Sequence, residues 1–252
     1  MHNHNTRCSH PIINAIFKPL LNLCCNVRFA CSKEAGTFLF GKRSCTVIIN
    51  GFNVAKYKYN VDKRNELRRQ FNLCNQTIIG HVGVFNYQKN HEFLLNIFFE
   101  YKKTISNAVL ILMGDGGLKE EIQSQAERLG LLDSVIFTGN RNDIHDLLNV
   151  IDVFVFPSRF EGLGIAPIEA QANGLPVIAS NRVPEIVKIN DNFLFLPLED
   201  GEKVWSEKIL KSQLTREENG CENVELAGFD IETVVANLYK TYEELMEINK
   251  CK

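Results

Sequence analysis

Hydrophobic residues recur along residues 77–196 in short, nearly continuous runs that are separated by longer segments of helical period. Runs rich in Val, Ile, Leu and Phe are typical of buried parallel strands, and the longer segments are typical of the helices that connect them. The runs predict strands over 77–84, 108–113, 134–138, 152–156, 176–180 and 193–196. The segments between them predict helices over 90–103, 117–129, 143–149, 167–173 and 183–188. The predicted fold class is therefore α/β, with a Rossmann-like, doubly wound parallel sheet.

The first fifty residues repeat this pattern only in part. An amphipathic stretch over 11–24, a strand over 28–31, a helix over 32–40 and a strand over 46–49 amount to one and a half strand–helix units. This is too little chain to close a second sheet of the same kind. We therefore expect an incomplete α/β remnant over 1–52, a linker over 53–72, the main domain over 73–228 and an amphipathic C-terminal helix within 229–252.

Composition places the chain among ordinary globular proteins, with 45% hydrophobic and 23% charged residues. The formal net charge of -2 argues against a nucleic-acid binder, because such proteins need a strongly basic face. The charge is uneven, since residues 1–70 hold twelve Lys or Arg against three Asp or Glu, whereas residues 71–252 hold sixteen against twenty-seven. A basic first part is compatible with contact with anionic lipids, and a scatter of solvated charges is the open alternative.

Three features of the chain could suggest a membrane span, disulfides or a metal site, and the sequence favours none of these. The apolar stretch 11–25 contains Asn14, Lys18 and Asn22 and is too short to cross a bilayer. The eight cysteines form no CxxC pair and the sequence has no signal-peptide pattern, so we expect reduced thiols in the cytoplasm. A His and Cys cluster at the beginning lacks the recurring spacing of a zinc site, and no metal is expected there. The cluster consists of His2, His4, Cys8 and His10.

The most informative segment runs from Phe156 to Ser180, with the sequence FPSRFEGLGIAPIEAQANGLPVIAS. It leaves a predicted strand and passes through a loop that contains Gly162 and Gly164. A helix follows, with Pro167 in its first turn and a stop at Gly174. Ligands of open α/β sheets bind at the carboxyl ends of the strands, and the positive end of a helix favours a phosphate. The segment therefore predicts a phosphate-binding turn.

Two carboxylates frame this turn, Glu161 in the loop and Glu169 within the helix that follows. Paired acceptors at this spacing can hold the hydroxyls of a sugar and a ribose on either side of a diphosphate. Taken alone, a Glu in the first helical turn often only complements the helix dipole. The whole string is far more specific than either residue.

Together these residues resemble the GT-B glycosyltransferases of the family 4 type, especially those of bacterial capsule and exopolysaccharide synthesis. The second domain of that family carries a Glu-x7-Glu signature, and the resemblance covers about residues 28–200. It implies that Glu161 contacts the hydroxyls of the donor sugar and that Glu169 contacts the ribose. It also implies that Lys89 neutralises the diphosphate. Further donor-binding positions implied by the resemblance are Gly83, Asn140, Arg141, Gly162, Leu163, Gly164 and Ile165.

The chain departs from the family pattern at two places. The family usually has an Arg five residues before the lysine, and this chain has Val84 there. Loss of a guanidinium beside a leaving diphosphate removes stabilisation of about 3 to 4 kcal/mol. The second departure is the first domain, which carries the acceptor site in the family and is expected to be truncated here. His4 matches a cleft histidine that some relatives place near the sugar, and we count it with Glu161 and Lys89 as catalytic.

The resemblance implies a retaining glycosyltransferase that uses a UDP- or GDP-sugar and a glycan or lipid-linked acceptor in surface polysaccharide synthesis. A separate chain that supplies the first domain is one expectation, and a weak or inactive remnant that only binds nucleotide sugar is the alternative. No Asp-x-Asp motif occurs, so neither a metal nor another cofactor is expected. The expected location is the cytoplasm, with peripheral contact at the inner face of the membrane left open.

Overall fold

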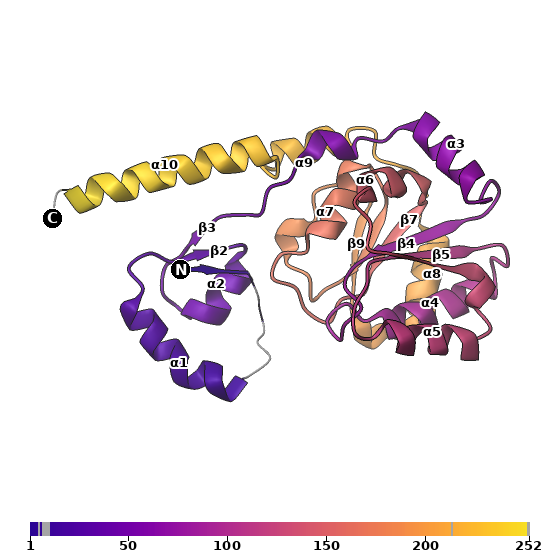
Figure 1. The fold of residues 1–252 in the computed structure, drawn as a ribbon, viewed down its shortest axis with the longest axis horizontal. Helices are drawn as coiled ribbons and strands as arrows, with labels where there is room; N and C mark the ends of the chain where they lie inside the picture. The colour runs from indigo at the N-terminus through magenta and orange to yellow at the C-terminus, as the bar shows by residue number, and fades with distance from the viewer. Residues whose placement is uncertain (5, 7–10, 213, 251–252) are drawn as a thin grey trace.

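The computed structural model describes residues 1–4, 6, 11–212 and 214–250. It contains two parallel sheets, one of three strands near the N-terminus and one of six strands in the larger part of the chain (Figure 1). A crossing segment, residues 48–72, and a long C-terminal helix connect the two parts (Figure 1). The predicted α/β class is confirmed.

The six-stranded sheet has the order β6-β5-β4-β7-β8-β9, and every pair of neighbours is parallel. Successive strands are added first on one side of β4 and then, from β7 onward, on the other side. The order therefore reverses between β4 and β7, where ligands of such sheets bind. The strands are β4 (Ile78–Val82), β5 (Val109–Met113), β6 (Val135–Gly139), β7 (Val153–Phe156), β8 (Val177–Ser180) and β9 (Phe193–Leu196).

Side chains of this sheet alternate between two hydrophobic cores, as period-two geometry requires. In β5, Ile111 and Met113 join the core beneath one set of helices, whereas Leu110 and Leu112 join the core beneath the other. Because both faces are covered, the strands are apolar at nearly every position, which explains why the sequence predicts them well. One face carries α4 (His91–Lys102), α5 (Lys119–Arg128) and α8 (Gly201–Lys211), and the other carries α6 (Ile144–Leu147), α7 (Ile165–Ala172) and α9 (Gly220–Leu226) (Figure 1).

Two helices of the larger part differ from the sequence prediction. Residues 183–188 hold only the 3-10 turn η4 (Glu185–Val187), because Pro184 fixes an extended backbone directly before it. The helix α8, which the sequence analysis missed, is held by Trp205, whose fully buried indole Nε1 donates to the carbonyl of Pro197 at 2.8 Å. The helix α9 was also missed.

The smaller sheet has the order β1-β2-β3 and consists of very short strands. The strands are β1 (His2–Asn3), β2 (Phe29–Ala30) and β3 (Thr46–Val47), with α1 (Pro11–Cys24) and α2 (Lys33–Phe40) between them. Ser32 caps α2, since its hydroxyl accepts from the amide of Ala35 at 3.1 Å. Several large apolar side chains of α1 are exposed, among them Ile12 and Leu23 at 76%. No helix in the described part of the chain is both long and apolar enough to cross a membrane.

Residues 53–72, which the sequence predicts as a linker, are largely helical and packed. They hold the 3-10 turn η1 (Val54–Tyr57) and the helix α3 (Val61–Gln70), and Asn53 and Asn60 cap them. The helix α10 (Ile231–Lys250) begins against the crossing segment, where the amide of Phe52 donates to the carbonyl of Phe229 at 3.0 Å. It then runs back over the smaller sheet (Figure 1). There the ring centroids of Phe29 and Tyr242 lie 6.0 Å apart.

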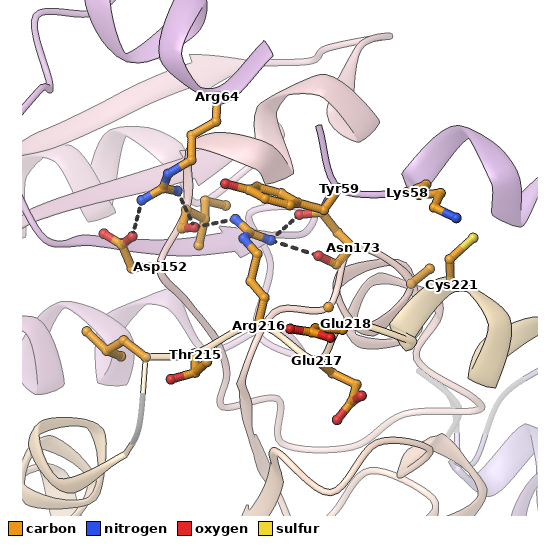
Figure 2. A pocket seen from close by; sticks show the side chains of 14 residues that line it. Lys58, Tyr59, Arg64, Asp152, Asn173, Thr215, Arg216, Glu217, Glu218 and Cys221 are labelled. Carbon is orange, nitrogen blue, oxygen red and sulfur yellow. Dashed lines mark hydrogen bonds and ion pairs between the residues drawn. The ribbon is translucent and has the colours of Figure 1, made fainter. Parts of the chain in front are cut away.

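Three arginines converge on one region at the amino ends of the strands. Arg64 and Arg68 both pair with Asp152, which also accepts the amide of Ile78 at 2.8 Å. Arg216 donates to the carbonyl of Ile151 at 2.7 Å and to neighbouring carbonyls, and its guanidinium lies 4.2 Å from the ring of Tyr59. Arg64, Asp152, Arg216 and Tyr59 line a cavity of about 550 Å³ (Figure 2).

The guanidinium groups at this cavity are already paired with carbonyl and carboxylate groups of the protein. Backbone carbonyls at the C-terminal end of η3 (Leu148–Val150) accept hydrogen bonds from all three guanidinium groups. The C-terminal end of a helical segment favours cations. The cavity lies at the edge of the sheet opposite to the phosphate-binding turn. We therefore interpret the arginine cluster as a structural clamp between α3, η3 and the loop before α9.

Asp152→Asn is expected to lower the free energy of unfolding by about 3 to 5 kcal/mol, because it leaves two mostly buried guanidinium groups without their carboxylate. The matched control is Glu66→Gln, which breaks the more exposed pair with Lys63 on the same helix and is expected to leave the free energy of unfolding nearly unchanged. Chemical denaturation followed by circular dichroism measures both. Equal effects of the two substitutions would contradict the clamp.

Candidate functional site

The predicted phosphate-binding turn lies at the carboxyl end of β7, next to the point where the strand order reverses. Residues 157–164 form the loop, and α7 begins at Ile165. Gly164 has φ 91°, a left-handed conformation that a residue with a side chain rarely adopts. The amides of Ile165 and Ala166 at the head of α7 have no partner within the helix, since the first turn of every helix leaves such groups. This arrangement favours an anion.

Glu161 and Lys89 form a buried ion pair beside this turn. Lys89 Nζ lies 2.7 Å from Glu161 Oε1, and the two side chains are 16% and 6% exposed. The second carboxylate oxygen accepts from Gln88 Nε2 at 3.0 Å. Lys89 Nζ also lies 4.6 Å from the ring centroid of Phe156, a cation–π distance. The structure therefore brings together two of the three residues predicted as catalytic.

Glycines allow the loop that carries Lys89 to pack closely. A Cβ on Gly83 would lie 3.0 Å from Lys89 Cγ, so a side chain there would displace the lysine. Gly114, which follows β5 with φ 140°, lies against the same loop, and a Cβ on it would be 2.2 Å from the carbonyl oxygen of Gly83. The loop after β4 is further joined to the loop after β7 by a bond from the amide of Arg159 to the carbonyl of Gln88, 2.8 Å long.

Glu169 lies in the second turn of α7, where it contacts the crossing segment. Tyr57 donates its phenol hydrogen to Glu169 Oε1 at 2.6 Å. Burial raises the pKa of Glu169 above its ordinary value. The hydrogen bond from Tyr57 and the proximity of His145 oppose this rise only in part. A cavity of about 380 Å³ opens beside Glu161, and Glu169 is not among the residues that line it. The two carboxylates of the motif thus have separate surroundings within the same strand–helix unit.

The other predicted donor-binding residues surround the turn to different degrees. Gly162, Leu163 and Gly164 are buried at the head of α7, and Ile165 is half-buried. Val84 is 55% exposed on the loop after β4.

Asn140 and Arg141 are exposed after β6. Arg141 pairs with Asp143, and its Nε lies 2.7 Å from Asp143 Oδ1. Asp143 precedes α6 but makes no side-chain capping bond, because its carboxylate is engaged by Arg141.

The N-terminal segment reaches the site through a residue that the sequence analysis did not single out. Thr6 donates its hydroxyl hydrogen to the carbonyl oxygen of Glu161 at 2.8 Å. His4, predicted as the third catalytic residue, follows β1 and has an exposed side chain. Cys8 and His10 of the His and Cys cluster lie outside the described residues. Among the described residues, no group of three or more His, Cys, Asp or Glu could hold a metal ion.

A pair of buried histidines supports the loop that carries Lys89. His81 in β4 is fully buried, and its Nδ1 lies 2.9 Å from the carbonyl oxygen of Val155, so this nitrogen carries the hydrogen. His91 stacks on Phe85 with ring centroids 4.0 Å apart and meets His81 edge-on. Burial lowers the pKa of His81 to about 3 and also lowers that of His91. Both rings are therefore neutral near pH 7, and they add no charge to the site.

Comparisons with known proteins identify the family of the chain. The family model described as glycosyl transferases group 1 matches residues 63–220. The chain belongs to this family. EpsF of Bacillus subtilis (strain 168), named as a glycosyltransferase, is 32% identical over 237 residues, which cover 90% of this chain and 62% of EpsF. A UDP-Gal:alpha-D-GlcNAc-diphosphoundecaprenol alpha-1,3-galactosyltransferase of Escherichia coli is 27% identical over 218 residues, which cover 81% of this chain and 55% of that enzyme.

Solved structures of other proteins show the same fold. HepE of Anabaena in complex with UDP and glucose superposes with a TM-score of 0.81 at 24% identity, over 96% of this chain and 70% of that one. Sucrose-phosphate synthase of Thermosynechococcus elongatus gives a TM-score of 0.79 at 24% identity, over 95% of this chain and 63% of that one. The GT-B assignment from the sequence is therefore confirmed. The chain spans about three fifths of the length of EpsF and of the galactosyltransferase.

His91→Phe is expected to reduce the loss of stability in acid. Unfolded histidine takes up a proton below about pH 6.5, whereas the folded form resists protonation until much lower pH. Each such histidine therefore removes about 1.4 kcal/mol of folding free energy between pH 7.5 and 5.5. Urea denaturation at both pH values should give a difference smaller by about that amount in the variant. An unchanged pH dependence would mean that the ring of His91 is protonated in the folded protein.

Proposed function

We propose that this chain provides the nucleotide-sugar-binding half of a retaining glycosyltransferase. Its donor is a UDP- or GDP-sugar, and its acceptor is a glycan or lipid-linked glycan in surface polysaccharide synthesis. The observation that carries the proposal is the buried pair of Lys89 and Glu161 beside the head of α7. A cation, a hydroxyl-binding carboxylate and unpartnered helix amides meet there, as a sugar linked to a diphosphate requires.

In this proposal each residue binds a different part of the donor. Lys89 and the amides of residues 162–165 neutralise the diphosphate, whose charge grows as the bond to the sugar breaks. Glu161 accepts hydrogen bonds from sugar hydroxyls, and Glu169 accepts them from the ribose. The backbone near Asn140 and Arg141 contacts the base. We assign His4 to the sugar side as part of this proposal, and the bond from Thr6 to the backbone carbonyl of Glu161 supports it by bringing the N-terminal segment to the site.

Charge neutralisation in this proposal depends on the protein alone. Lys89 supplies a full positive charge within a buried setting, where an ion pair is much stronger than in water. When donor binds, the ammonium exchanges part of its contact with Glu161 for the diphosphate, and Gln88 continues to hold the carboxylate. No metal or other cofactor is required in this scheme.

A second candidate function is nucleotide-sugar binding with little or no turnover. Val84 supports it, because this exposed apolar residue supplies no charge at the rim of the site. Donor binding is common to both candidates, and turnover of the donor separates them.

The exposed apolar surface of α1, beside the smaller sheet, supports the proposal of a partner. The helix α1 exposes a row of large apolar side chains that monomeric proteins normally cover. We propose that the remainder of a first domain, supplied by a separate chain, covers this face. Contact of the same helix with the inner face of the membrane is the competing arrangement, and in both cases we propose a cytoplasmic location.

Isothermal titration with UDP, GDP, UDP-glucose and GDP-mannose, all in EDTA, tests donor binding. The wild-type protein is expected to bind one of the two nucleotide series, and Lys89→Met is expected to weaken binding by roughly thirtyfold, since a hydrogen bond to a charged group is worth about 2 kcal/mol. Lys103→Met, on the exposed end of α4, is the matched control and should bind as the wild type does.

Two further measurements keep this result interpretable. The double variant Lys89→Met with Glu161→Gln removes both charges of the buried pair and serves where the single variant fails to fold. Hydrolysis or transfer of the bound UDP- or GDP-sugar by the wild-type protein distinguishes an enzyme from a binding protein. No heat with any nucleotide, in a protein shown to be folded, would overturn both candidate functions.

Val84→Arg is expected to strengthen binding of the nucleotide diphosphate by roughly tenfold, because an exposed position on the loop of Lys89 leaves room for a guanidinium to reach the phosphates. Leu132→Arg adds the same charge at the opposite edge of the sheet, where η2 (Leu132–Ser134) precedes β6, and should leave the affinity unchanged. Titration with UDP and GDP measures both. Equal affinities of the two variants would place the diphosphate away from this loop.

A further inference from the structure

Tyr57 is the only described residue that donates a hydrogen bond to the carboxylate of Glu169. It comes from the crossing segment, 112 positions away in the sequence, and none of the motifs of the donor site includes it. The bond joins the phenol oxygen to Oε1 at 2.6 Å, a short distance typical of a hydroxyl that donates to a charged carboxylate. Among the described residues, Oε2 of Glu169 has no hydrogen-bond partner.

The ring of Tyr57 is held from several sides. Its edge meets the rings of Phe52, at 5.1 Å between centroids, and of His145, at 6.1 Å. Its backbone carbonyl accepts from Asn173 Nδ2 at 2.8 Å. Asn173 lies one helical turn after Glu169, so both contacts are made with the same face of α7. The phenol oxygen is therefore fixed relative to the helix that carries the carboxylate.

We propose that Tyr57 is a positioning residue for nucleotide binding, which fixes Oε1 of Glu169 so that the carboxylate presents Oε2 to the vicinal diol of the donor ribose. This inference rests on the proposed function, since it takes Glu169 as the ribose contact. It adds a residue of the crossing segment to the donor site. The phenol does not touch the ligand and acts through Glu169.

The phenol also keeps the carboxylate in the ionised form that accepts two hydroxyl hydrogens. Burial raises the pKa of Glu169, and the groups that lower it are Tyr57 from η1 and His145 from α6. Burial and the adjacent carboxylate raise the pKa of the Tyr57 phenol, so it remains a donor throughout the physiological range. Removal of the phenol oxygen therefore raises the pKa of Glu169 and shifts the acid loss of binding to higher pH.

Tyr57→Phe tests the inference, because it keeps the ring and removes one oxygen atom. Dissociation constants are measured by titration with UDP and with 2′,3′-dideoxy-UDP, or with the guanosine pair where the wild type prefers GDP. The variant is expected to bind UDP about tenfold more weakly and to bind the dideoxy nucleotide as the wild type does. The penalty disappears because the dideoxy nucleotide has no diol for Glu169 to hold.

Tyr59→Phe is the matched control, since this ring stacks on Arg216 at the opposite edge of the sheet. It should leave both dissociation constants unchanged. In a pH series, the affinity of Tyr57→Phe for UDP should begin to fall at higher pH than that of the wild type. His145 is present in both proteins, so the difference between them isolates the phenol.

Each outcome of the experiment supports or overturns the inference. Equal weakening for UDP and the dideoxy nucleotide would mean that Tyr57 only anchors the crossing segment, and unchanged UDP binding would remove any role in the site. Both results would leave the proposed function intact, because the wild type still binds nucleotide. A folded wild-type protein that binds no nucleotide would overturn the proposed function and this inference together.

Discussion

The arrangement of the candidate site depends on one buried ion pair, Lys89 with Glu161. Two charges removed from water are tolerable only when they meet at short distance and their remaining hydrogen-bonding capacity is satisfied. Gln88 satisfies the second carboxylate oxygen, and the face of Phe156 receives the ammonium. The requirement for close approach then accounts for glycine at position 83. The conformations of the loops after β4 and β7 thus depend on the ion pair that joins the two loops.

A second set of contacts fixes the crossing segment to the larger sheet. Tyr57 binds Glu169, the amide of Asn60 donates to Asn149 at 2.8 Å, and Arg64 and Arg68 bind Asp152. These bonds reach both edges of the sheet, the carboxyl edge through α7 and the amino edge through Asp152. The segment therefore behaves as part of the domain that it leads into, and the position of the Glu169 carboxylate depends on chain that lies outside the sheet.

The sequence predicted the larger fold well because its strands are covered on both faces. All six strands of the larger sheet agree with the predicted runs to within about two residues at each end, and the long helices between them agree similarly. The crossing segment was predicted poorly because its hydrophilic pattern carries no helical period, and α3 is held mainly by ionic contacts of Arg64 and Arg68. The motif indicated Glu161 and, through a family resemblance, Lys89. The sequence pattern does not indicate Tyr57 or Thr6. Tyr57 donates to the carboxylate of Glu169 and Thr6 to the backbone carbonyl of Glu161, and more than a hundred positions separate the residues of each pair.

The charge asymmetry of the sequence has a different meaning once the chain is folded. Several basic residues among the first seventy lie in the crossing segment, where they pair with acidic residues of the larger part or with carbonyls. Lys58 pairs with Glu222 at 2.8 Å, and Arg64 and Arg68 neutralise Asp152 inside the protein. A basic count along the sequence therefore overstates the positive surface that is available to an anionic membrane. What remains distinctive about the smaller part is the set of exposed apolar side chains on α1, which an electrostatic attraction to lipid does not account for.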